Sequence, residues 1–297
     1  MSKPAQQGAF GAVIVGCGDV GCRVGARLRA RAMPVLGLAR SAPGCERIRA
    51  AGLEALQLDL DAGRWSSLPA LRGALVFYFA PPAREGEDDA RLARFLARLD
   101  TRERPPRLVY ISTSGVYGDC GGAWVDETWP LAPRTARAKR RAAAEQCLQA
   151  WSRTRDAEVV VLRVPGIYGP GRLPLERLRR GFPVVREAEA PCSNRIHVDD
   201  LAAAAVLAAD KAPPGCVYNV ADGRPSTMTD YLNRVADWAG VSRPPQISLA
   251  RARRELSPAM LSFLEESRRL DCRRLFGELG FVPRYPDLDA GLASCRI

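Results

Sequence analysis

The segment AVIVGCGDVG, residues 12–21, constrains the fold of this chain more than any other stretch. A short run of β-branched residues enters three glycines with the spacing Gly16-x-Gly18-x-x-Gly21, and apolar residues with helical spacing follow over 19–31. This pattern predicts a buried strand, a tight turn and a helix. Gly16 permits the turn, Gly18 lets the backbone approach a pyrophosphate, and Gly21 permits close packing of the helix on the strand. The segment therefore predicts a dinucleotide-binding βαβ unit, with a plain tight turn as the alternative.

Strands and helices are predicted to alternate along most of the chain. The predicted strands cover 12–16, 34–40, 55–58, 73–80, 107–113, 157–164 and 216–222, and the predicted helices cover 19–31, 43–51, 88–100, 136–151, 198–210 and 226–240. Such alternation is typical of βαβ units and of a parallel sheet covered by helices on both faces. We predict an α/β fold with a Rossmann-type doubly wound parallel sheet.

Glycine and proline become dense after residue 165, as in PGIYGPGRLP, and the end of the chain has no regular pattern. This change of texture predicts two parts. An NADP-binding Rossmann domain is expected from 10–164 plus 198–222. A smaller C-terminal substrate-binding lobe is expected from 165–197 plus 223–297.

The end of the second predicted strand indicates which dinucleotide is bound. Folds that prefer NAD often carry an acidic residue there for the ribose hydroxyls, whereas this chain has Arg40 followed by Ser41. A guanidinium binds a 2′-phosphate that a carboxylate would repel. The sequence thus predicts NADP, with NAD less favoured, unless Arg40 is simply one of many surface arginines.

Composition excludes several classes of protein. The formal net charge is +11, but the basic residues are interspersed with acidic ones and no nucleic-acid motif is visible, so we do not expect a nucleic-acid partner. No apolar run is long enough for a membrane span, and no signal-peptide pattern precedes the first strand, so a cytoplasmic protein without a membrane partner is expected. The nine cysteines are odd in number and lack a C-x-x-C motif, which argues against disulfides and zinc and favours small buried residues. No metal is expected.

Several ordered motifs in this chain resemble the extended short-chain dehydrogenase/reductase family, also called the NAD-dependent epimerase/dehydratase family. They are the glycine loop, LDL at 58–60, FAPP at 79–82, YISTSGVYGD at 110–119, DETWPLAP at 126–133, LRVPGIYGPG at 162–171, RIHVDDLA at 195–202 and YNVADGRP at 218–225. The resemblance covers nearly the whole chain. Together with the glycine loop and Arg40, it assigns these residues to the cofactor: Gly16, Cys17, Gly18, Asp19, Val20, Gly21, Arg40, Ser41, Asp59, Leu60, Phe79, Ala80, Pro81, Lys139 and Pro165.

The resemblance also implies a catalytic set, which this chain keeps only in part. The family's hydroxyl that bonds the substrate oxygen matches Thr113, and its lysine, which holds the nicotinamide ribose, matches Lys139. Only three of the 44 basic residues are lysines, which supports a specific role for Lys139 over a solvated helix lysine. The family's tyrosine, four residues before the lysine, is Thr135. An aliphatic hydroxyl is a far weaker acid than a phenol, so acid–base catalysis is expected to suffer. Because Thr135 follows PLAPR and precedes an alanine-rich helix, we favour it as a helix N-cap.

Other groups are candidates for the missing phenol and for substrate binding. Tyr117 is a candidate catalytic tyrosine and Tyr168 a second candidate to replace the phenol, although in the family both positions are usually structural or line the substrate site. Ser114 is expected to contact substrate, and Arg195 to bind an anionic group of the substrate through its forked guanidinium. His197 is the sole histidine, and its segment is mostly architectural in the family, so a general-base role is the less favoured alternative.

Further departures place the chain near the family's atypical members. The loop is G-x-G-x-x-G where extended members usually show G-x-x-G-x-x-G, and Gly166 stands where an asparagine is often found. In the atypical subgroup the cofactor site is kept while the catalytic set is eroded. The resemblance therefore implies an NADP-dependent oxidoreductase or epimerase/dehydratase acting on a carbonyl, secondary-alcohol or sugar-nucleotide-like small molecule. The alternative is a non-catalytic NADP-binding sensor or scaffold. By analogy a homodimer through helices such as 136–151 is a further expectation.

Overall fold

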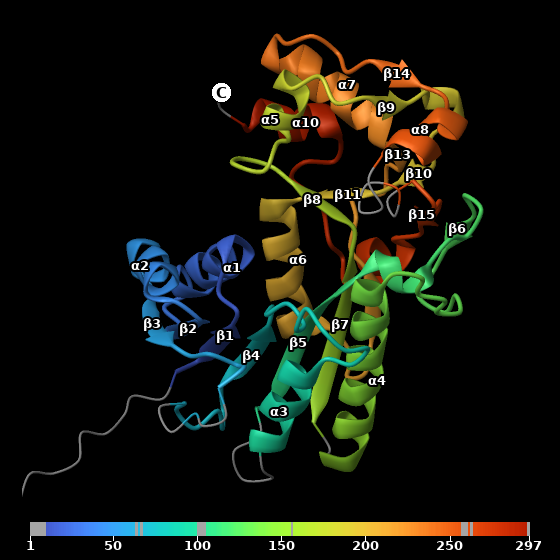
Figure 1. Cartoon of the computed structure of the whole chain (residues 1–297). Coiled ribbons are helices and arrows are strands. Elements are labelled where there is room, and N and C mark those ends of the chain that lie inside the picture. Colours follow the sequence, from blue (N-terminus) through green and yellow to red (C-terminus); the bar gives the residue numbers. More distant parts are fainter. Residues whose placement is uncertain are drawn as a thin grey trace, which may run out of the picture. The chain divides into compact units, whose positions relative to one another are not determined.

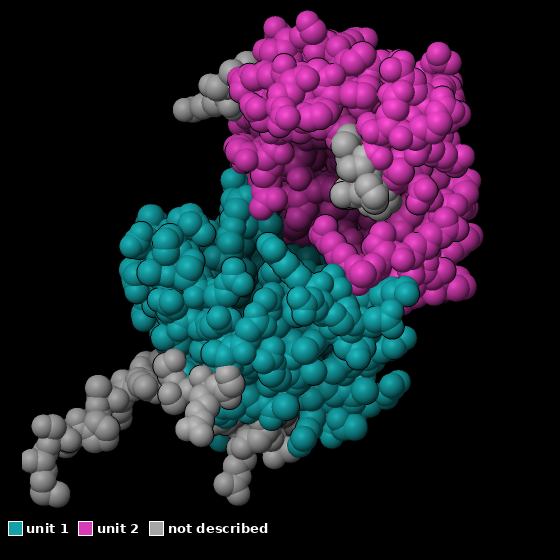
Figure 2. Space-filling view, viewed as in Figure 1, with its two compact units in different colours: residues 1–112, 139–162, 202–217 teal, residues 113–138, 163–201, 218–297 magenta. Residues whose placement is uncertain are grey.

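The computed structural model of this chain describes residues 10–62, 65, 68–99, 105–155, 157–256, 261 and 264–295. The chain divides into two compact units, teal and magenta in Figure 2. Unit 1 comprises Met1–Ser112, Lys139–Leu162 and Ala202–Val217, and unit 2 comprises Thr113–Ala138, Arg163–Leu201 and Tyr218–Ile297. The predicted division into a dinucleotide-binding domain and a substrate lobe is a statement about function, and it stays a prediction.

Unit 1 is built on a seven-stranded sheet (Figure 1). The strands are β1 (Ala12–Val15), β2 (Val35–Ala39), β3 (Glu54–Gln57), β4 (Leu75–Tyr78), β5 (Arg107–Thr113), β7 (Glu158–Val164) and β12 (Val217–Asn219). Their order is β12-β7-β5-β4-β1-β2-β3, and the central pairs from β5 to β3 are parallel. These are the seven strands that the sequence predicts, and the Rossmann-type doubly wound sheet is confirmed.

The strand order reverses next to β1. From β1 the chain adds β2 and β3 on one side, and then returns to place β4 on the other side. Ala12 accordingly pairs with Val35 of β2 and with Leu75 of β4. All four residues of β1 are buried, as expected for a strand covered on both faces. In open α/β sheets ligands bind beyond the carboxyl ends of the strands at such a switch point, which here is where the glycine loop lies.

Helices cover both faces of this sheet. They are α1 (Asp19–Arg29), α2 (Ala42–Ala50), α3 (Ala90–Arg98), α4 (Ala136–Arg155) and α6 (Val198–Lys211). Helices α3 and α4 lie on one face, and α1, α2 and α6 lie on the other (Figure 1). All five correspond to predicted helices, with ends that differ by a few residues. Residue 100, the predicted end of α3, lies outside the described residues, as do residues 1–9.

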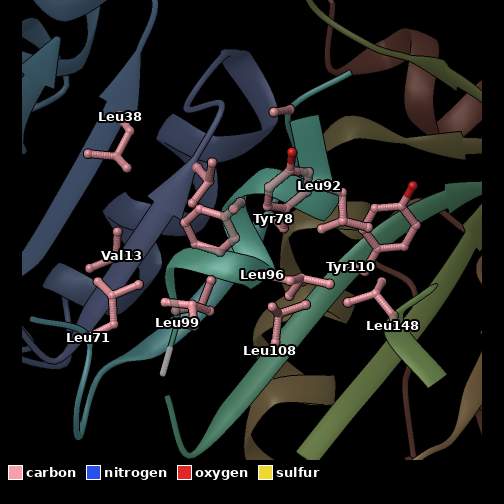
Figure 3. Close-up of a cluster of buried hydrophobic side chains, with 14 of the residues drawn as sticks. Val13, Leu38, Leu71, Tyr78, Leu92, Leu96, Leu99, Leu108, Tyr110 and Leu148 are labelled. Atoms are coloured by element: carbon pink, nitrogen blue, oxygen red, sulfur yellow. The ribbon is translucent and has the colours of Figure 1, made fainter. Parts of the chain in front are cut away.

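The core under α3 and α4 is a continuous apolar cluster (Figure 3). Leu92 and Leu96 of α3 and Leu148 of α4 pack onto inward-facing strand residues. The ring of Tyr78 lies 6.1 Å from that of Tyr110, centroid to centroid. Aromatic pairs at this spacing add stability beyond the area they bury. This core holds the carboxyl ends of β4 and β5 in fixed positions, and those ends lead into predicted site residues.

Unit 2 has shorter elements. They are η1 (Ser114–Tyr117), β6 (Trp124–Val125), β8 (Gly166–Tyr168), α5 (Leu175–Arg179), β9 (Val184–Val185), η2 (Glu187–Glu189), β10 (Cys192–Ser193), β11 (Arg195–His197), β13 (Ser226–Thr227), α7 (Met228–Ala239), β14 (Gln246–Ile247), α8 (Leu249–Glu255), β15 (Arg269–Leu270), η3 (Arg274–Glu278) and α10 (Leu288–Ala293). The strands pair two at a time: β8 with β11, β10 with β13, β9 with β14, and β6 with β15. Helix α7 is the predicted helix 226–240. It begins after the capping hydroxyl of Thr227 and ends at Gly240, whose φ is +64°. The other elements were not predicted.

Candidate functional site

The glycine loop at the end of β1 has the geometry that its sequence predicts. Gly16 has φ +79°, and a Cβ built on it would lie 2.5 Å from backbone atoms of Ala80. A Cβ on Gly21 would lie 3.0 Å from Ile14 and 3.1 Å from the sulfur of Cys17. Gly16 is therefore required by the turn and by its close approach to Ala80 after β4, and Gly21 by the packing of α1 on β1.

Gly18 differs from its two neighbours in the motif. It is the N-cap of α1, supplies no capping side chain, and has no atom within 4 Å of an added Cβ. Its φ of −87° is one that any residue adopts. The space beside Gly18 is therefore open at a helix start that no side chain caps, and helix N-termini of this kind are suited to binding anions. Asp19 in that turn bonds to Arg23 at 2.9 Å, and Val20 is half-buried.

The remaining predicted cofactor residues of unit 1 follow the carboxyl ends of neighbouring strands. Arg40 and Ser41 come directly after β2, Asp59 and Leu60 follow β3, and Phe79–Pro81 follow β4. Arg40 is exposed, and its guanidinium makes no hydrogen bond or ion pair with the residues that the structure describes. Ser41 caps α2, with its hydroxyl accepting from the Gly44 N–H at 3.4 Å.

Lys139 lies in the first turns of α4 and Pro165 directly after β7. The Lys139 ammonium is 3.3 Å from the carboxylate of Glu87, and these side chains are 47% and 80% exposed. An ion pair so exposed contributes little, so Lys139 is available to exchange Glu87 for another partner.

Unit 2 contains a cavity of about 520 Å³. Figure 2 shows a recess in the visible face of this unit. The cavity is lined by Thr113, Ser114, Gly115, Thr135, Arg137, Ala138, Pro165, Gly166, Ile167, Tyr168, Arg172, Pro191, Cys192, Ser193, Asn194, Arg195, Met228, Tyr231, Glu266 and Arg268. Its volume suits a small organic ligand. The structure thus brings Thr113, Ser114, Thr135, Pro165, Tyr168 and Arg195 to one cavity.

Two threonines present hydroxyls at the cavity. The Oγ1 of Thr113 accepts from the Gly115 N–H at 3.2 Å, which leaves its own proton free to be donated. The Oγ1 of Thr135 accepts from the Ala138 N–H at 3.1 Å, at the start of α4. The predicted N-cap at Thr135 is confirmed. Ser114 beside Thr113 is buried.

Arg195 is the most deeply placed charge in this cavity, at 6% exposure. Its guanidinium donates to the hydroxyls of Ser193 and Ser226, at 3.0 and 2.7 Å, and to the Thr227 carbonyl at 2.7 Å, and it lies 4.5 Å from the ring centroid of Tyr231. All these partners are neutral, and no carboxylate within the described ranges forms an ion pair with it. Burial lowers the pKa of Arg195, because removing the guanidinium from water disfavours its charged form, and the nearby carboxylates of Asp222 and Asp230 only partly oppose this shift.

A charged pair at the cavity, Arg268 with Glu266, was not predicted from the sequence. Arg268 donates to Glu266 at 2.8 Å and to the Gly118 carbonyl at 2.5 Å. The Nε of Arg268 and the Oε1 of Glu266 are buried and find no hydrogen-bond partner among the described residues. Both residues lie in a segment without a regular pattern, and only its richness in arginine offered a signal. Arg137 and Arg172, also unpredicted, bring the arginines in the lining to four, against one carboxylate.

Tyr117 lies outside this cavity lining and is 1% exposed. Its hydroxyl donates to Asn219 at 2.7 Å and accepts from Arg163 at 2.9 Å. The Asn219 N–H in turn donates to Glu127 at 2.7 Å. A catalytic role for Tyr117 would require breaking this buried network, since its proton is committed to Asn219.

Tyr168 and His197 are both held by the C-terminal part of unit 2. The Tyr168 hydroxyl donates to the Asp287 carbonyl at 3.1 Å, and burial raises its pKa. His197 is fully buried and is not among the residues that line the cavity. Its Nδ1 accepts from the Asp199 N–H at 3.2 Å, so Nε2 carries the proton toward the Ser294 hydroxyl at 3.1 Å. This bonding is what an architectural histidine needs.

Comparison with known proteins decides the family. The family model of the NAD-dependent epimerase/dehydratase family matches residues 12–221. This chain belongs to the NAD-dependent epimerase/dehydratase family. Protein YeeZ of Escherichia coli K12 is 28% identical over 282 residues, which cover 92% of this chain and 96% of YeeZ.

Solved structures support the same placement. A conserved protein of unknown function from Silicibacter pomeroyi DSS is 32% identical, with a TM-score of 0.83 over 96% of this chain and 97% of that one. UDP-glucose 4-epimerase of Thermus thermophilus, solved with NAD, is 25% identical, with a TM-score of 0.75 over 95% and 97%. Members of the epimerase/dehydratase family thus share the fold of this chain over nearly its full length.

Membrane-spanning helices and metal clusters are both absent from the described residues. No helix there is long and apolar enough to cross a membrane. No group of three or more His, Cys, Asp or Glu side chains in the same residues is arranged to hold a metal ion.

Proposed function

We propose that this chain binds a nicotinamide dinucleotide at its glycine loop, with NADP preferred over NAD. We further propose that it acts as an oxidoreductase or epimerase/dehydratase on a small anionic carbonyl or secondary-alcohol compound, of which sugar nucleotides are one class. The observation that carries the proposal is the open space at Gly18, beside an α1 N-terminus that no side chain caps. A backbone cradle of this kind fits a pyrophosphate.

The preference for NADP rests on Arg40. Its guanidinium follows β2, is exposed, and has no ion pair with any carboxylate in the described ranges. It is therefore free to bind a 2′-phosphate, which a forked donor holds well. Ser41 beside it supplies a hydroxyl as a second donor.

The chain's own residues then supply binding and polarisation. A bound nicotinamide would supply or accept the hydride. The Thr113 hydroxyl, which already accepts from Gly115, would donate to the substrate oxygen, with Ser114 beside it. Lys139 would leave its exposed contact with Glu87 and hold the ribose, as its family counterpart does.

The substrate is proposed to be anionic because of Arg195. A buried guanidinium with only neutral partners is stabilised by any ligand that brings a phosphate or carboxylate. The excess of arginines in the lining adds to this attraction. A cytoplasmic location and a homodimer, both expected from the sequence, stay predictions.

A second candidate function is favoured by Thr135. Its hydroxyl caps α4 where the family has a catalytic phenol, so the chain lacks a phenol that could act as the general acid at that position. General acid–base catalysis is worth about 10²–10⁴-fold in rate. A chain without it is suited to sensing NADP or to scaffolding a partner.

Fluorescence titrations with NADPH and with NADH test the first part of the proposal. Tighter binding of NADPH is expected, and binding of neither dinucleotide would sink the proposed function. Turnover of a sugar-nucleotide panel then separates enzyme from sensor. The Thr135→Tyr variant is the probe, and Thr135→Ser, which keeps the cap, is its control. Activity that appears only in Thr135→Tyr would mark a decayed enzyme.

A further inference from the structure

Two cysteines face each other within the glycine loop. Cys17 lies between Gly16 and Gly18, and Cys22 lies in the first turn of α1. Their sulfurs are 4.0 Å apart, within hydrogen-bond contact. No other two of the nine cysteines are in such contact within the described residues.

The two thiols differ in exposure and acidity. Cys22 is half-buried, whereas Cys17 is 4% exposed. The hydrogen bond from the Cys17 thiol lowers the pKa of Cys22 to about 7, with help from Arg47 and Arg23 and against the opposing charge of Asp19. The same contact and burial raise the pKa of Cys17. Cys22 is thus the nucleophile of the pair and Cys17 the resolving thiol.

We propose that Cys17 and Cys22 form a redox-sensitive dithiol whose oxidation to a disulfide weakens dinucleotide binding at the glycine loop. The oxidant is a hydroperoxide. The Cys22 thiolate attacks its terminal oxygen, the O–O bond breaks, and a sulfenic acid and an alcohol form, or water when the oxidant is hydrogen peroxide. The Cys17 sulfur then attacks the sulfenic sulfur, losing its proton and releasing water. Two thiols and one hydroperoxide give one disulfide, one alcohol and one water.

Closing the disulfide must displace the loop. The sulfurs have to move from 4.0 Å to about 2 Å apart. The Cys17 sulfur is buried against Gly21 and Gly37, with the sites where their Cβ atoms would be built 3.1 and 2.9 Å away, so it has little room to turn. The backbone between Cys17 and Cys22 must therefore take up the movement. That backbone contains Gly18 and the first-turn N–H groups, so the phosphate cradle is distorted.

The effect is reciprocal. A dinucleotide that binds the reduced loop more tightly than the oxidised loop stabilises the reduced form. It therefore protects Cys17 and Cys22 from oxidation by the same factor by which oxidation weakens dinucleotide binding. This consequence rests on the proposed function, whereas formation of the disulfide does not. Disulfide formation and dinucleotide binding can be tested separately, because mass spectrometry measures the first and ligand titration the second.

The test uses the full chain, reduced, desalted and treated with hydrogen peroxide. Trypsin releases residues 1–23 as one peptide, because Lys3 precedes a proline, and this peptide holds both cysteines. A disulfide lowers its mass by two hydrogens. We expect that loss, slower formation in saturating NADPH, and an NADPH dissociation constant at least tenfold higher for the oxidised protein. Dithiothreitol is expected to restore the binding.

Two variants complete the experiment. Cys22→Ser is expected to bind NADPH as the reduced protein does and to be indifferent to peroxide, whereas Cys147→Ser, with a half-buried thiol on α4, keeps the full response. Absence of the 17–22 disulfide, or a disulfide without a change in NADPH affinity, overturns the proposal. Failure of the reduced protein to bind either dinucleotide instead defeats the proposed function, and the coupling falls with it whatever the mass spectrum shows.

Discussion

The two units encode their sites in different ways. In unit 1 the candidate site is largely backbone, namely a glycine turn, a helix N-terminus and the carboxyl ends of parallel strands, to which Arg40 and Lys139 add side chains. In unit 2 it is a cavity lined by side chains from segments far apart in the chain, from Thr113 to Arg268. A site made of backbone groups is determined by residues a few positions apart in the sequence. A site made of side chains depends on how short elements that are distant in the sequence pack together in the fold. This contrast between the two units leads to four testable expectations.

Substitutions at Gly16 and Gly18 should have different effects, the first on the stability of the fold and the second on dinucleotide binding. Gly16→Ala places a Cβ 2.5 Å from Ala80 at a φ of +79°, and we expect it to lower the free energy of unfolding by about 2–5 kcal/mol. Gly18→Ala meets no atom within 4 Å, so its stability should stay within about 0.5 kcal/mol while dinucleotide affinity falls at least tenfold. Urea unfolding and NADPH titration measure the two. Equal losses of stability would contradict the distinction.

In unit 2, ionisation of the buried carboxyl of Asp222 should cost the folded protein stability. Burial raises the pKa of Asp222 to about 6. Between pH 4 and 6 the folded protein therefore binds more protons than the unfolded chain, and stability falls as pH rises. Asp222→Asn should raise the free energy of unfolding by about 2–3 kcal/mol at pH 7.5 and by little below pH 4. A pH series of thermal melts measures this, with the exposed Asp237→Asn as the control that should show no such trend.

Arg40 should determine the choice between NADPH and NADH without affecting the fold. A hydrogen bond to a charged group is worth about 1.5–3 kcal/mol, so Arg40→Ser should weaken NADPH binding about 10- to 100-fold. NADH affinity and the melting temperature should not change. Arg84→Ser, at an exposed position outside the predicted set, is the matched control. Parallel losses for both dinucleotides in Arg40→Ser would show that the guanidinium does not read the 2′-phosphate.

Thr135 should give the smallest effect. Loss of its capping bond to Ala138 in Thr135→Ala should cost about 1 kcal/mol of stability, and Thr135→Ser should cost almost nothing. Chemical denaturation compares the three proteins. If Thr135→Ala stays folded but loses far more activity than Thr135→Ser, the Thr135 hydroxyl has a role in catalysis as well as in capping α4.

The fold and site of unit 1 could be predicted from the sequence to a greater extent than those of unit 2. The seven sheet strands and α7 were predicted because β-branched runs, glycine turns and helical spacing are local signals. The two-residue strands of unit 2, such as β9 with β14, have no period to read, and their pairing joins Val184 to Gln246. Arg195 was predicted by resemblance to the family, but Glu266 and Arg268 were not, because no local pattern brings them to the cavity. The commitment of the Tyr117 proton to Asn219 joins residues 102 positions apart and was equally beyond reach.

The contrast between Gly16 and Gly18 also bears on descent. Selection for a folded chain alone retains Gly16, because a side chain there collides with Ala80. Among the described residues no atom lies within 4 Å of a Cβ on Gly18, so in a lineage that had stopped binding dinucleotides this position could change to alanine or serine while Gly16 stayed fixed. Among descendants of a common ancestor, frequent substitution at Gly18 together with an unchanged Gly16 would therefore mark lineages that have lost dinucleotide binding. This signal does not depend on changes in the catalytic residues around Thr135.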